Sequence, residues 1–145
     1  MLVSQILKDK PIQEVVRVAP GTSVGEAASL LSAKKIGGLI VCDGGTMTPL
    51  GIVTERDIVR ELGKRGQVCL EDKVEDIMTR EIVTCDPHDR AIRVLQIMTE
   101  KRFRHMPVMD DGKMIGLVSI GDVVKARLDE LSAQADALKN MIMGY

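Results

Sequence analysis

The chain has 145 residues, 45% hydrophobic and 28% charged, which is ordinary for a soluble domain. Twenty Lys and Arg residues against 21 Asp and Glu residues give a net charge of −1, so the basic excess of a nucleic-acid or membrane-surface binder is absent. No apolar run approaches the about 20 residues of a membrane span. Three cysteines without C-x-x-C spacing read as reduced thiols. We therefore expect a cytoplasmic protein that has no nucleic-acid or membrane partner.

The sequence repeats itself at an offset of 67 residues, which places Pro20 over Pro87. A short strand is expected before each proline, at 15–18 and at 82–85. A helix follows each proline, with Ser23 as the expected N-cap of the first and Asp89 of the second. The matching apolar positions of these helices have the spacing of one buried face. They are Val24, Ala27, Ala28 and Leu31 in the first copy and Ala91, Val94, Leu95 and Met98 in the second.

Each copy continues with two strands joined by a glycine-containing turn. The first strands are expected at 39–42 and 106–109, and the return strands begin at Gly51 and Gly116. A further helix is expected from about residue 55 and from about residue 120. Similar segments, 3–7 and 74–78, precede the two copies.

These patterns predict an α+β fold built from two β-α-β-β-α repeats and a C-terminal helix. The repeats are expected at 1–66 and 67–127, followed by a helical extension at 128–145. Because a copy of about sixty residues is marginal alone, we expect the two to pack through their sheets with pseudo-twofold symmetry.

The same short element recurs where a strand of each copy turns into a helix: Thr54-x-x-Asp57 and Ser119-x-x-Asp122. One interpretation is a capping box, in which hydroxyl and carboxylate satisfy the first backbone N–H groups. The other uses the same place for a ligand. The helix N-terminus and the hydroxyl suit a phosphate, while the aspartate suits the hydroxyls of a sugar. Together these groups describe a nucleoside phosphate.

The doubled Gly-h-h-Thr/Ser-x-x-Asp element (h apolar), the paired prolines and the run from Arg104 to Val108 resemble a tandem pair of CBS domains, named for cystathionine β-synthase. The resemblance covers about residues 1 to 126. It implies an adenosine nucleotide with its adenine in an apolar cleft between the sheets. The implied base contacts, which are equally ordinary core positions, are Val16, Arg17, Val18, Leu39 and Ile40 in the first copy and Val83, Thr84, Cys85, Met106 and Pro107 in the second.

Basic residues cluster after the first helix of the second copy. Lys101 and Arg102 are explained by the helix dipole, whereas Arg104 and His105 enter the next strand. The resemblance favours Arg104 and His105 as phosphate contacts. The first copy has Gly37-Gly38 at the matching places, so we expect the two clefts to differ in affinity.

The tail carries an apolar seam of period 3.5, which is typical of a helix that packs along another helix. The seam consists of Val124, Leu128, Leu131, Ala135, Leu138 and Ile142. It is expected to make a homodimer contact, and the alternative is that the helix folds back onto its own domain.

The preferred function is a non-catalytic sensor that binds AMP or a related adenosine ligand, such as ADP, ATP, NAD or S-adenosylmethionine, and signals to an unknown effector protein in trans. No catalytic residues, metal site or required cofactor are expected. Two alternatives stay open: a structural interaction module with empty clefts, and a weak nucleotide-processing enzyme.

Overall fold

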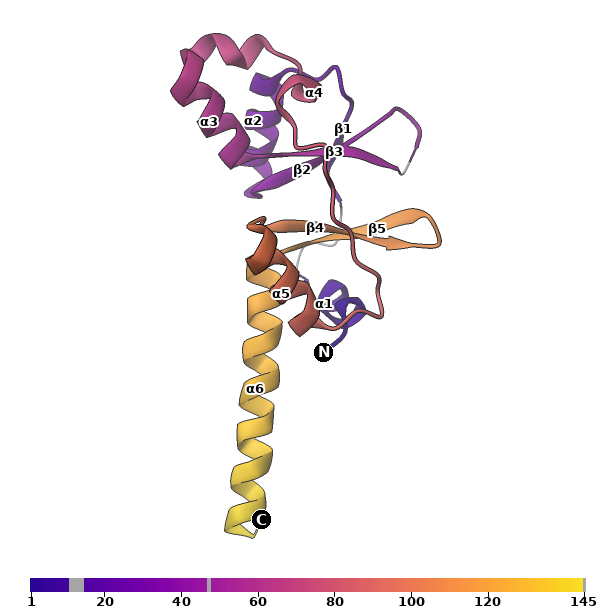
Figure 1. Cartoon of the computed structure of the whole chain (residues 1–145), viewed down its shortest axis with the longest axis vertical. Coiled ribbons are helices and arrows are strands. Elements are labelled where there is room, and N and C mark those ends of the chain that lie inside the picture. The colour runs from indigo at the N-terminus through magenta and orange to yellow at the C-terminus, as the bar shows by residue number, and fades with distance from the viewer. Residues whose placement is uncertain (11–14, 47, 145) are drawn as a thin grey trace. The chain divides into compact units, whose positions relative to one another are not determined.

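A computed structural model describes residues 1–10, 15–46 and 48–144 of the chain (Figure 1). The elements in chain order are α1 (Val3–Asp9), β1 (Arg17–Val18), α2 (Val24–Lys34), β2 (Gly38–Cys42), β3 (Pro49–Thr54), α3 (Glu55–Arg65), the 3₁₀ helix η1 (Gly66–Glu71), α4 (Val74–Ile77), α5 (Ala91–Lys101), β4 (His105–Asp110), β5 (Lys113–Ser119) and α6 (Ile120–Met143). The structure is therefore a mixture of helices and strands, and the expected helix starts near residues 55 and 120 are confirmed.

The residues gather into two compact units. The central unit comprises Glu14–Val83 and Asp111–Ile115. The terminal unit comprises Met1–Gln13, Thr84–Asp110 and Gly116–Tyr145.

The central unit contains a three-stranded sheet in the order β1-β2-β3. β1 runs parallel to β2, and β2 runs antiparallel to β3, with Leu39 opposite Val53. The helix α2 begins as expected, because the Ser23 hydroxyl oxygen accepts a hydrogen bond from the Glu26 N–H at 3.1 Å. The sheet and α2 thus bring the first copy's elements together as the sequence pattern predicts.

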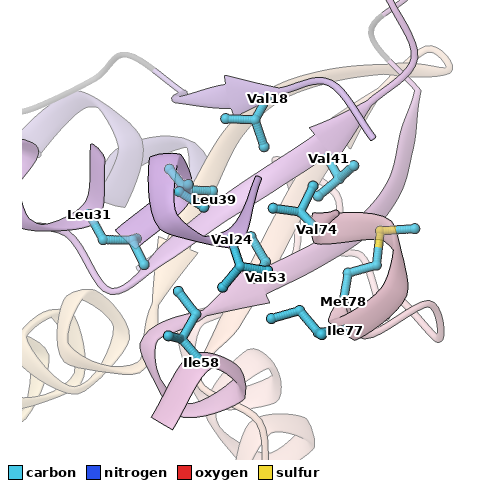
Figure 2. Close-up of a cluster of buried hydrophobic side chains, with 11 residues drawn as sticks. Val18, Val24, Leu31, Leu39, Val41, Val53, Ile58, Val74, Ile77 and Met78 are labelled. Atoms are coloured by element: carbon cyan, nitrogen blue, oxygen red, sulfur yellow. The ribbon is translucent and has the colours of Figure 1, made fainter. Parts of the chain in front are cut away.

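The core of the central unit lies between this sheet and its helices (Figure 2). Val24 and Leu31 of α2 pack there with Leu39 of β2. The α4 segment contributes Val74 and Ile77, together with Met78 just after it. Met78 also passes close over Gly51, where an added Cβ would lie 2.4 Å from the Met78 sulfur. Gly51 is therefore required by close packing, and it lies inside β3, which begins at Pro49 rather than at Gly51 as expected.

The terminal unit combines α1, α5, β4, α6 and the later residues of β5, from Gly116 on. Backbone hydrogen bonds tie α1 to the loop before α5: the Val3 N–H donates to the Asp89 carbonyl and the Ser4 N–H to the Pro87 carbonyl, both at 2.9 Å. Leu7 of α1 covers Gly116, where an added Cβ would lie 2.6 Å from a Leu7 methyl carbon. The matching glycines of the two copies are thus covered in the same way.

The similar segments that precede the two copies are exchanged between the units. α1 comes before the first copy but packs with the second copy's elements, and α4 comes before the second copy but packs with the first. The repeat boundaries expected at residues 66 and 127 follow the sequence pattern and stay a prediction. The compact units are defined by contacts instead. They differ from the sequence repeats at the two leading segments, α1 and α4.

Two expectations around Pro87 differ from the structure. The strand expected at 82–85 is reduced to a single bridge between Cys85 and Val108. Asp89 does not cap α5, because its carboxylate accepts the Asp86 N–H at 2.8 Å and Arg90 occupies the N-cap position. Of the two alternatives given for the tail, the one in which the helix folds back does not occur, since α6 continues as one helix to Met143. Among the described residues, no helix has the length and apolar content needed to cross a membrane.

Candidate functional site

The turn from β3 into α3 is closed by a complete capping box. The Asp57 N–H donates to the Thr54 hydroxyl oxygen at 3.2 Å, and Asp57 Oδ2 accepts from the Thr54 N–H at 2.9 Å and from its hydroxyl at 3.1 Å. The Arg60 guanidinium, one turn along α3, donates to Asp57 Oδ1 at 3.0 Å. The Asp57 side chain is 6% exposed. Burial of this carboxylate is therefore offset by a cation, one backbone N–H and one hydroxyl.

The turn from β5 into α6 repeats the capping box with a different cation. Asp122 Oδ2 accepts the Ser119 N–H at 2.9 Å, and the Asp122 N–H donates to the Ser119 hydroxyl oxygen at 3.1 Å. Lys10, just after α1, places its Nζ 2.9 Å from the same Oδ2 and donates to the Leu117 carbonyl at 2.7 Å. Burial raises the pKa of Asp122, but the Ser119 N–H and the Lys10 ammonium outweigh burial and hold this pKa below its ordinary value.

The residues expected to distinguish the two copies lie beside these turns. The Arg104 carbonyl accepts the Ile120 N–H of α6 at 2.8 Å, just as the Gly37 carbonyl accepts the Glu55 N–H of α3 at 3.0 Å. His105 begins β4 at the place where Gly38 begins β2. Arg104 is exposed and His105 is half-buried. The predicted correspondence of Arg104-His105 with Gly37-Gly38 is confirmed at the level of the backbone.

The apolar candidates of the first copy lie on two paired strands. Arg17 is opposite Ile40, and the Ile40 N–H donates to the Val16 carbonyl at 3.2 Å. Val18 and Leu39 belong to the core of the central unit, as the core interpretation expects for them. Ile40 is fully buried and, by strand alternation, faces the opposite side of β2 from Leu39. Arg17 is exposed and Val16 is half-buried.

The candidates of the second copy meet at the start of β4. The Cys85 N–H donates to the Pro107 carbonyl at 3.0 Å, which brings the two segments together. Met106 and Pro107 are buried, whereas Thr84 is exposed. Burial, with smaller contributions from Asp89 and Asp86, raises the pKa of Cys85 to about 12, so its thiol is protonated at neutral pH and is a poor nucleophile. Val83 is half-buried and is the last residue of the first segment of the central unit, whereas the other four belong to the terminal unit.

Sequence reasoning missed Lys10 and Arg60, the cations paired with the two aspartates. Arg60 had a local signal, because a residue three positions after Asp57 lies on the same helix face. Lys10 had none, since it is 112 positions before Asp122 and reaches it only through the packing of α1 in the terminal unit.

Comparison with known proteins places these turns in a family. The family model of the CBS domain matches residues 3–64 and 74–129. The mitochondrial CBS domain-containing protein CBSX3 of Arabidopsis thaliana is 39% identical over 84% of this chain, which spans only 61% of the length of that relative.

Solved structures are similar over the same region. The CBS-domain protein ATU1752 of Agrobacterium tumefaciens has a TM-score of 0.83 at 42% identity, covering 88% of this chain and 99% of that one. The CBS domain pair of protein MJ0100, in complex with 5′-methylthioadenosine and S-adenosyl-L-methionine, has a TM-score of 0.76 at 27% identity, covering 90% and 98%. CBSX2 in complex with AMP has a TM-score of 0.71 at 33% identity, covering 88% and 96%. With two family matches on two matching repeats, this chain belongs to the CBS domain family as a tandem CBS pair.

Proposed function

We propose that this chain is a regulatory module that binds an adenosine nucleotide, AMP first among the candidates, and passes its binding state to an effector protein in trans. The proposal is carried by one observation: the Thr/Ser-x-x-Asp turn occurs twice, each time at the start of a helix with a paired cation. Its wider support is that similar CBS pairs are known in complex with AMP, 5′-methylthioadenosine and S-adenosyl-L-methionine.

The capping interpretation and the ligand interpretation are compatible, because a carboxylate has about four lone-pair sites. Asp57 uses three of them, for the Thr54 N–H, the Thr54 hydroxyl and Arg60. Asp122 uses two, for the Ser119 N–H and Lys10. Asp122 is also the more accessible, at 24% exposed against 6% for Asp57. Asp122 is therefore the better acceptor for a pair of ribose hydroxyls.

The cations favour the same copy. Arg104 and His105 lie at the start of β4, where the Arg104 carbonyl accepts a hydrogen bond from the Ile120 N–H of α6. The first copy has two glycines at the matching place. In this proposal Arg104 and His105 contact the phosphate, and the Ser119 turn is the tighter of two unequal sites. The homodimer and the cytoplasmic location predicted from the sequence are part of the proposal.

The test is a nucleotide panel read by thermal unfolding of the full chain. We expect AMP, and more weakly some of ADP, ATP, NAD and S-adenosylmethionine, to raise the melting temperature. A ligand at 100 times its dissociation constant adds about 2.7 kcal/mol to the unfolding free energy, which is several degrees for a domain of this size. GMP is the matched control, because it keeps the ribose and phosphate and changes only the base.

Calorimetric titration with AMP gives the number of sites. Two sites of unequal affinity are expected. If no adenosine ligand shifts the melting temperature at millimolar concentration and calorimetry is silent, the proposal is wrong and the module with empty clefts is the better description. Equal shifts by AMP and GMP would reject adenine recognition.

A further inference from the structure

The α6 helix has an inner stripe that is already packed. Val123 and Ala126 are buried, and Arg127 and Glu130 are half-buried, at the i, i+3, i+4, i+7 spacing of one helix face. This stripe packs on α5 and α1 of the same unit. Packing of α6 within the terminal unit therefore ends at about residue 130.

The second half of α6 extends away from α5 and α1 (Figure 1). Every residue from 131 to 144 is exposed, and the family match ends at residue 129. Leu128 is 60% exposed, Leu138 57% and Ile142 77%. A lone helical segment of this length is marginal in water, where helices shorter than about 12–15 residues do not hold by themselves. The terminal unit therefore leaves the apolar residues of the tail uncovered.

Six of the exposed apolar residues of α6 form a continuous seam. Steps of four and three connect Val124, Leu128, Leu131, Ala135, Leu138 and Ile142, which are the a and d positions of a heptad pattern. At about 100° per residue, the seam is centred about 100° around the helix axis from the inner stripe. A second helix can lie along the seam without displacing α1 or α5.

We propose that the seam pairs with the seam of a second copy of this chain, in a parallel, in-register, two-stranded coiled coil. The charges beside the seam favour this partner and direction. A parallel pair sets Arg127 opposite Ser132 of the partner chain and Gln134 opposite its Lys139, so like charges do not meet. An antiparallel pair with the same overlap sets Lys125 opposite Lys139 twice, which is repulsive. Leucines at two of the three d positions, Leu131 and Leu138, also suit a two-stranded coil.

This inference rests on the proposed function for the homodimer and gives that dimer its contact surface, but it holds whether or not a nucleotide binds. The full chain, measured by sedimentation over a range of concentrations, is expected to give twice its 15.9 kDa mass. Leu131→Glu and Leu138→Glu should each weaken the dimer at least about 100-fold, because two carboxylates replace two buried leucines in the pair. Ala133→Glu is the matched control, since this residue lies on the opposite side of the same helix from the seam. It should leave the dissociation constant unchanged.

Direction is tested by cross-linking of Ala135→Cys under mild oxidation, with the wild type as background for the three buried native cysteines. In the parallel pair the two introduced thiols face each other and join, whereas an antiparallel pair sets each one opposite Leu131. A monomeric wild type overturns the proposal. So does a dimer that survives both leucine substitutions, because another surface then holds it. A dimer without the disulfide overturns the parallel direction. Circular dichroism confirms that each variant keeps its helix.

Discussion

Lys10 and Arg60 neutralise equivalent aspartates by different routes, one from a distant segment and one from the same helix. The Lys10 pair is the more informative to perturb, because it also fastens α1 to the start of α6. Its electrostatic contribution has a defined pH window. The folded-state pKa of Asp122 lies below the ordinary value of 3.8, so its stabilisation is complete above that value and is lost as the pH falls through the lower, folded-state pKa.

We therefore expect Lys10→Met to lower the unfolding free energy by up to about 1 kcal/mol at neutral pH. The difference from the wild type should shrink as the pH falls below about 4, because protonated Asp122 no longer attracts the ammonium. Urea unfolding of the variant and the wild type, from neutral pH to below about pH 4, measures this difference. Lys34→Met, at an exposed helix end, is the control and should show no such dependence. A loss that stays constant down to the lowest pH would mean that Lys10 acts through its bond to the Leu117 carbonyl instead.

Arg104 gives the sharpest residue-scale test of the nucleotide proposal. Its side chain is exposed, so Arg104→Ala should leave the apo melting temperature nearly unchanged. Loss of a charge-assisted contact to phosphate costs about 1.5–3 kcal/mol, which is about 10- to 150-fold in AMP affinity at one site. Adenosine, which has no phosphate, should bind both proteins alike. Lys101→Ala, at the exposed end of α5, is the matched control for loss of a nearby positive charge. Equal losses for AMP and adenosine would show that Arg104 supports the fold and does not contact phosphate.

At the scale of elements, the close contact between the α4 segment and β3 depends on Gly51. An added Cβ would contact the Met78 side chain and, at 3.0 Å, the Thr79 carbonyl oxygen. Because that carbonyl belongs to the backbone, it cannot shift without a cost in free energy. Gly51→Ala should therefore lower the unfolding free energy by about 1–3 kcal/mol. Gly116→Ala should cost less, because the atoms it meets are those of the Leu7 side-chain end.

Gly63→Ala is the control for these two changes. Gly63 lies inside α3 with nothing within 4 Å of an added Cβ, so alanine should raise stability by about 0.5–1 kcal/mol. Thermal unfolding of the three variants measures whether their stabilities follow this order, with Gly51→Ala lowest and Gly63→Ala highest. If Gly51→Ala proved as stable as the wild type, the α4 segment would not be held against β3 as described.

The elements that sequence could predict are those whose signals are local. The apolar faces of α2 and α5, the Ser23 cap and the helix starts after Thr54 and Ser119 all depend on residues within a turn of one another, and all are confirmed. The strand expected before Pro87 does not form. A segment with a strand-like sequence becomes a strand only where a partner strand continues beside it, and Cys85 makes a single bridge to Val108.

The candidate site divides in the same way. Both Thr/Ser-x-x-Asp turns and the place of Arg104 beside the second could be found from the repeat, since their geometry is set by neighbouring residues. The cation on Asp122 could not, because it depends on which segment packs against α6. Sequence pattern alone put segment 3–7 with the copy that follows it, whereas tertiary packing places it in the other unit.

At the scale of the whole molecule, the terminal unit is interrupted: its first segment and the rest of it lie on either side of the central unit in the chain. Synthesis therefore completes Glu14–Val83, most of the central unit, while the terminal unit has only α1. At about 5–20 residues per second, the 112 positions between Lys10 and Asp122 take roughly 5–20 s to emerge from the ribosome. During that interval the segments that bury Val3 and Ile6 in the folded unit are incomplete. The apolar residues of α1 are thus available to a chaperone until the later segments of the same unit, α6 included, have been made.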